Sequence, residues 1–231
     1  MACILYELLG ADDRRFSPHV WRSLMALHHK GLRPERRPLC FTQLDQVEFS
    51  GHKRVPLLVD GERTVSDSWD IACYLEDAYP DAPSLFGGTV GRAQARFVNN
   101  WADTELHPAL MRQIVLDIHD HLVTADQEYF RTSREKRLGG PLEEVQAEAR
   151  AHALEPLRKH LEPLRATLAA QPFLCGEAPA YADYIVFGAF QWARCISAFA
   201  VVADDDPICG WRRNMLGLFD GLGAEAVGYP L

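Results

Sequence analysis

The sequence of 231 residues lacks the features that mark membrane and secreted proteins. It contains no run of about 20 apolar residues, the length that a helix needs to cross a lipid bilayer. No basic segment follows Met1, and the first apolar run is short and ends at Glu7, so we expect no secretion signal. These absences predict a cytoplasmic location and no membrane partner.

Basic segments are also missing. Lys and Arg total 24 against 32 Asp and Glu, which gives a net charge of -8, and no basic block could follow a nucleic-acid backbone. The six cysteines are scattered, with no C-x-x-C pair and no partnered histidine at metal spacing. The histidine pairs His28-His29 and His119/His121 lack the four-residue spacing that would place them on one helix face. We expect no nucleic-acid partner, no metal site and reduced cysteines.

What is present is the composition of an ordinary globular protein, with 48% hydrophobic and 24% charged residues. The first third alternates strand and helix patterns, and Asp60-Gly61 marks a hairpin turn. The expected elements are a strand at 3–8, a helix from Ser17, strands at 36–41, 56–59 and 63–65, and a helix at 67–79. The order is β-α-β followed by β-β-α.

From about residue 89 the strand signals stop. Helices are expected at 92–121, 142–170, 181–200 and 207–222, separated by glycine- and proline-containing breaks. The sequence therefore predicts an α/β domain at 1–83, a short linker, and an all-helical domain at 89–231.

Ser17-Pro18 is the first of three motifs with chemical meaning. Ser is a favoured helix N-cap and Pro a favoured first helical residue, so a plain helix start explains the pair. A helix N-terminus is also electropositive, and a serine hydroxyl there can donate a hydrogen bond to a bound thiolate. Both interpretations place Ser17 at the same point of the fold.

The other two motifs are Val55-Pro56 and Asp67-Ser68. A proline at a strand start is compatible with a trans bond, or with a cis bond that turns the Val55 backbone toward a peptide-like ligand. Asp67 and Ser68 open a helix, where they can act as caps or bind the ammonium and carboxylate of an amino-acid head group.

Together, in this order and at these separations, the three motifs resemble the glutathione site of the cytosolic glutathione transferases of the serine type. Residues 176–183 resemble the folding motif of that superfamily, in which a buried Asp reaches back to a helix start, although Ala180 stands where Ser, Thr or Asn is usual. Residues 17–22, 55–56, 67–69, 100–101 and 117–120 are similar to the bacterial β-etherase and fungal etherase-type (FuA-like) subgroup. The resemblance implies a thioredoxin-like N-terminal domain, a C-terminal helical bundle and a homodimer.

The resemblance also assigns roles. Ser17 would stabilise the glutathione thiolate, Val55 ahead of cis-Pro56 would bind the cysteinyl backbone, and Asp67 with Ser68 would hold the γ-glutamyl end. Arg54 would meet the glycyl carboxylate, with Lys53 or His52 as alternatives.

The implied activity uses glutathione as co-substrate, without a metal, for attack on a hydrophobic aromatic electrophile, including aryl-ether cleavage. Two alternatives stay open: a non-catalytic binder of glutathione and aromatic ligands, and a glutathione-dependent thiol reductase. Reduction is disfavoured because Ser17 stands where a reductase needs cysteine. Five large side chains could either line an aromatic pocket or fill the core, and the sequence leaves both interpretations open. They are Trp21, Trp101, Met111, Tyr129 and Trp192.

Overall fold

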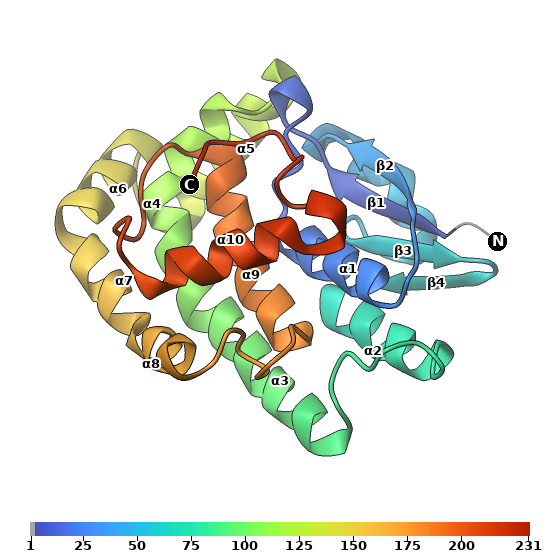
Figure 1. Ribbon diagram of the computed structural model, residues 1–231. Coiled ribbons are helices and arrows are strands. Elements are labelled where there is room, and N and C mark those ends of the chain that lie inside the picture. Colours follow the sequence, from blue (N-terminus) through green and yellow to red (C-terminus); the bar gives the residue numbers. More distant parts are fainter. Residues whose placement is uncertain (1–2) are drawn as a thin grey trace.

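The computed structural model describes residues 3–231, and its N-terminal part is built on a four-stranded mixed sheet of order β2-β1-β3-β4 (Figure 1). Strand β1 is parallel to β2 and antiparallel to β3, and β3 forms a hairpin with β4. The elements are β1 (Ile4–Leu8), α1 (Pro18–His29), β2 (Glu35–Leu39), β3 (Leu57–Asp60), β4 (Arg63–Ser66) and α2 (Ser68–Ala78). The predicted β-α-β and β-β-α order is confirmed.

Apart from loops and an isolated bridge between Phe173 and Gly176, the described chain after α2 is helical, as predicted. The helices are α3 (Thr89–Trp101), α4 (His107–Asp120), α5 (Thr124–Leu138), α6 (Leu142–Glu148), α7 (Leu154–His160), α8 (Glu162–Ala170), α9 (Tyr181–Ile196) and α10 (Pro207–Gly221). Short 3-10 segments are η1 (Ala11–Asp13) and η2 (Phe41–Ser50), and π-helical turns are η3 (Ala102–Leu106) and η4 (Ala149–Ala153). No helix in residues 3–231 combines the length and apolarity needed to cross a membrane.

Helix boundaries differ from the sequence prediction in several places. The single helix expected at 142–170 is divided into α6, η4, α7 and α8, and the helix expected at 181–200 ends at Ile196. The single helix expected at 92–121 is interrupted by η3, which ends just before Pro108, a residue without the N–H that a regular turn requires. Helix α5 was not among the expected helices, because only Asp126 and Phe130 are buried along it and no apolar stripe marks it.

Helix α1 lies between the sheet and α9, so the two parts of the chain share one hydrophobic core (Figure 1). Gly188 on α9 permits this approach, since a Cβ atom there would lie 2.4 Å from the carbonyl oxygen of Pro18. The start of α1, with Ser17 and Pro18, is therefore held against the helical part of the protein.

Candidate functional site

Ser17 is the N-cap of α1 and is 5% exposed. Its Oγ accepts a long hydrogen bond of 3.4 Å from the Val20 N–H. The hydroxyl proton has no acceptor within residues 3–231, so it is available to a ligand. The geometry combines a free donor with the positive end of a 12-residue helix, a combination that stabilises an anion.

A cavity of about 340 Å³ lies beside Ser17, large enough for a small aromatic ligand. Val55 and residues of α1, α4, α5 and α9 contribute to its wall. Its apolar lining includes Phe16, Phe41, Met111, Ile118, Phe130 and Trp192. The structure thus brings Ser17 and Val55 to one cavity, with an apolar wall that includes two of the large side chains singled out in the sequence, Met111 and Trp192.

The Val55-Pro56 peptide bond is cis. Neither the N–H nor the C=O of Val55 makes a hydrogen bond inside the part of the chain that the structure describes. A free donor and acceptor on one residue match the backbone of an extended peptide. Nearby, Lys53 pairs with Glu48 at 3.3 Å, whereas exposed Arg54 has no ion-pair partner among residues 3–231 and does not line the cavity.

Asp67 and Ser68 begin α2, outside the lining of this cavity. Asp67 is exposed, has a φ of 77°, and accepts a hydrogen bond of 2.8 Å from the Trp69 N–H. Ser68 is buried, and its carbonyl accepts a 2.6 Å hydrogen bond from the Tyr181 hydroxyl of α9. The second helix start is therefore fixed by the helical part of the chain, as the first one is.

A polar cluster that the sequence reasoning missed forms part of the cavity wall. His19, Asp103 and His107 place one ligand-type atom each within 4.8 Å of one another, which is metal-like geometry. However, Arg22 donates to Asp103 Oδ1 at 2.8 Å and lies 3.1 Å from His107 Nε2. This guanidinium already balances the carboxylate and would repel a metal cation, so we interpret the cluster as a hydrogen-bonded wall.

Both imidazoles of this cluster are neutral at pH 7. Burial, reinforced by the positive charge of Arg22, lowers the pKa of His19 to about 4. The same two causes, in the same order, hold the pKa of His107 well below its usual value. Each neutral ring offers one N–H donor and one acceptor to its surroundings.

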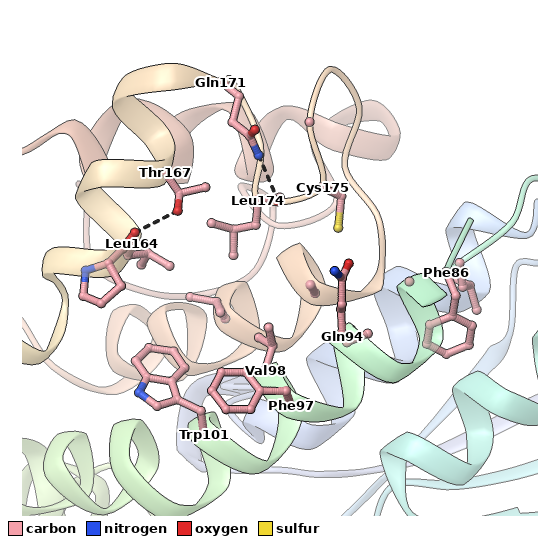
Figure 2. Close-up of a pocket in the computed structure, with 17 residues that line it drawn as sticks. Phe86, Gln94, Phe97, Val98, Trp101, Leu164, Thr167, Gln171, Leu174 and Cys175 are labelled. Atoms are coloured by element: carbon pink, nitrogen blue, oxygen red, sulfur yellow. Dashed lines mark hydrogen bonds between the residues drawn. The ribbon is translucent and has the colours of Figure 1, made fainter. Parts of the chain in front are cut away.

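A larger cavity of about 670 Å³ lies away from Ser17, between α3, α8 and the segment before α9 (Figure 2). Figure 2 shows Phe97, Val98 and Trp101 of α3 facing Leu164 and Leu174 across it. None of the predicted site residues lines this cavity. Trp101, a candidate for the aromatic pocket, belongs here, while Trp21 is simply core at 1% exposure and Tyr129 is 54% exposed.

Cys40 directly precedes Phe41 of the cavity wall and lies at a helix start that the sequence did not reveal. It is the N-cap of η2, in the segment that follows β2. Burial and the Asp126 carboxylate raise the pKa of its thiol above the ordinary value. Cys40 therefore lacks the lowered pKa of a redox-active cysteine despite its position.

Two family models match the chain. The Glutathione S-transferase N-terminal domain matches residues 16–78, and the Glutathione S-transferase C-terminal domain matches residues 93–202. Together they cover about three quarters of the chain, in the order expected for the complete fold. The chain belongs to the glutathione transferase superfamily.

Individual relatives agree with this placement. The glutathione S-transferase-like protein ustS of Aspergillus flavus is 24% identical over 224 residues, covering 82% of this chain and 78% of that protein. The crystal structure of glutathione transferase FuA3 of Phanerochaete chrysosporium has a TM-score of 0.76 and 25% identity, covering 97% of this chain and 94% of that one. A Ceriporiopsis subvermispora glutathione S-transferase, crystallised with glutathione, has a TM-score of 0.75 and 23% identity, with coverages of 98% and 95%.

Proposed function

We propose that this transferase binds glutathione across the starts of α1 and α2 and activates its thiol for attack on an aromatic electrophile. The observation that carries the proposal is the meeting of the free Ser17 hydroxyl and the unpaired Val55 backbone at one cavity. Val55 would pair with the cysteinyl backbone, and Asp67 with Ser68 would hold the γ-glutamyl end. Arg54, free of ion pairs among residues 3–231, would meet the glycyl carboxylate.

Ser17 would act by stabilising the sulfur as an anion. A free thiol has a pKa near 8.5, so only a few per cent is ionised at neutral pH. The Ser17 hydroxyl would donate to the thiolate, and the N-terminus of α1 would favour its negative charge. The sulfur then forms a bond to the electrophilic carbon, and the leaving group departs with the bonding electrons.

Aryl-ether cleavage is the variant of this step in which a phenolate leaves, and the sequence resemblance to the etherase-type subgroup supports it. The neutral His19 ring lines the same cavity as Ser17 and offers a donor for a departing oxygen. Comparing aryl ethers with aryl halides as electrophiles tests this part of the proposal. Turnover of halides with no release of phenol from any ether would contradict it.

The central experiment follows the ultraviolet absorbance of glutathione thiolate through a pH titration with and without the protein. We expect the bound thiol to titrate at a lower pH than free glutathione. An unshifted titration would instead support the non-catalytic binder. Faster reduction of glutathione mixed disulfides than conjugation of electrophiles would support the reductase.

We further propose a homodimer that uses the outer face of α3. Phe97 and Val90 on this helix are 74% and 73% exposed, and Phe97 borders the 670 Å³ cavity shown in Figure 2. Exposed apolar surface of this kind beside a cavity marks a contact site between proteins. A second copy of the chain is the occupant that the superfamily implies.

The variant Phe97→Glu is expected to shift the protein from dimer to monomer, because a carboxylate would be placed in an apolar contact. Light scattering coupled to size-exclusion chromatography measures the change. Val227→Glu, at a residue 40% exposed near the end of the chain, is the matched control and is expected to stay dimeric. A monomeric wild type, or a dimeric Phe97→Glu variant, would refute this interface.

A further inference from the structure

Two arginines on α5 line the cavity beside Ser17. Arg134 and Arg137 are three residues apart, so their side chains leave the helix on neighbouring positions of one face. Within residues 3–231 neither of them pairs with a carboxylate. On the same helix, Arg131 pairs with Glu135 and Glu143, each at 2.9 Å. The two cavity arginines are therefore distinguished by their missing counter-ions.

Arg134 is held in apolar surroundings. Its guanidinium carbon lies 4.7 Å from the centre of the Phe130 ring and 5.8 Å from that of Phe41. Its Nε is buried without a hydrogen-bond partner, and Nη1 donates only to Ser133 Oγ at 2.9 Å. A cation in such a place costs folding free energy unless an anion joins it.

Helix α5 is fixed relative to the N-terminal part of the chain. The buried Asp126 carboxylate accepts hydrogen bonds from the backbone N–H groups of Phe41 and Thr42, at 2.6 and 2.9 Å. These bonds tie the first turn of α5 to the start of η2 and hence set the position of Arg134 over the cavity. The arrangement is a preorganised cationic patch on the wall of a cavity that also carries aromatic side chains and the polar cluster of His19, Asp103 and His107.

We propose that the second substrate of this enzyme is an aromatic electrophile carrying a carboxylate, with the carboxylate bound by Arg134 and Arg137. The aromatic ring would lie against Phe41, Met111 and Trp192, with the carboxylate on α5 and the electrophilic carbon directed toward the thiolate at Ser17. The inference rests on the proposed transferase function and names the chemical class of its substrate. Guanidinium groups suit this task because they bind carboxylates through paired, charge-assisted hydrogen bonds.

The test uses two electrophiles that differ in the charge of one group, the carboxylate of 4-chloro-3,5-dinitrobenzoate and the neutral group of its methyl ester. In both, the thiolate sulfur forms a bond to the ring carbon and chloride leaves with the bonding electrons. For the wild type we measure the ratio of kcat/KM for the acid to kcat/KM for the ester. We expect this ratio to exceed the ratio of the two second-order rate constants for the uncatalysed reaction with free glutathione. In Arg134→Gln and Arg137→Gln the enzymatic ratio should fall about 10- to 100-fold, the usual effect of losing a charged hydrogen bond.

Three variants make the result specific. Arg131→Gln removes a charge from the same helix and is expected to keep the wild-type ratio, while Arg134→Lys should restore part of it. Arg137 is exposed, so its replacement leaves the core intact and keeps the test valid if Arg134→Gln folds poorly. An unchanged ratio in Arg137→Gln and a folded Arg134→Gln would overturn the proposal. The proposal would also be overturned if these two variants raised the KM for glutathione equally with both electrophiles. The arginines would then bind glutathione and not the second substrate.

Direct binding separates this inference from the proposed function. Calorimetry with unreactive 3,5-dinitrobenzoate and its methyl ester reports recognition of the carboxylate without any turnover. We expect the acid to bind more tightly than the ester, and this preference to disappear in Arg137→Gln. Equal affinity of the two probes for the wild type would refute the inference, whereas failure of the thiol titration would refute the transferase function alone.

Discussion

Replacing Ser17 by alanine is expected to lower kcat/KM for glutathione conjugation by about 100-fold, the usual effect of removing one preorganised donor from a developing or bound anion. The pKa of bound glutathione should rise toward that of the free thiol, because only the N-terminus of α1 would still favour the thiolate. Stopped-flow rates at several pH values, together with the thiolate absorbance, measure both effects.

Ser23→Ala is the matched control for this variant. Ser23 lies on the same helix and is buried, but its hydroxyl donates to the His19 carbonyl at 3.2 Å. The variant Ser23→Ala therefore also removes a buried hydroxyl from α1, but it leaves the free donor at the cavity in place. The 3.4 Å bond from Val20 to Ser17 is long, so the loss of the cap should cost less than about 1 kcal/mol of stability. If Ser17→Ala lowered the pKa of bound glutathione as much as the wild type does, the N-terminus of α1 would be stabilising the thiolate without help from the serine hydroxyl.

The fold could be predicted because the signals that begin and end its helices and strands are local in the sequence. Ser17-Pro18 begins a helix, Asp60-Gly61 turns a hairpin and Pro80 follows the end of a helix, and each signal acts through the backbone of a few residues. The division at about residues 83–89 stays a prediction. Helix α5 was not predicted because it is stabilised by charged pairs and a few buried contacts and has no apolar stripe.

The site could be predicted only where it is made of local motifs. Ser17 and Val55 belong to such motifs, whereas Arg134 and His107 reach the cavity through helices more than 80 residues further along the chain than Ser17. Their role depends on which charges find partners, a property of the tertiary structure. In the sequence, Arg131 and Arg134 look equivalent, and only the folded chain pairs one and leaves the other beside the cavity.

Asp183 is the residue whose loss we expect to damage the fold most. Its carboxylate is fully buried and accepts four hydrogen bonds. The donors are the backbone N–H groups of Leu174 at 2.7 Å, Cys175 at 3.2 Å and Ala180 at 3.2 Å, and the Trp211 indole at 3.0 Å. Since Ala180 has no side-chain acceptor, Asp183 provides the hydrogen bond that organises the start of α9.

Asp183→Ala is expected to lower the free energy of unfolding by about 4 kcal/mol, because one buried donor, the Trp211 indole, and three part-buried backbone N–H groups lose their acceptor at about 1–3 kcal/mol each. That is a large part of the stability of a typical protein, so the variant should be markedly less stable than the wild type. Urea denaturation followed by circular dichroism measures the difference, with exposed Asp205→Ala as control. A loss near 1 kcal/mol would mean that water replaces the carboxylate. Because α9 holds both Pro18 and Ser68, partial unfolding there should abolish glutathione binding before the sheet is lost.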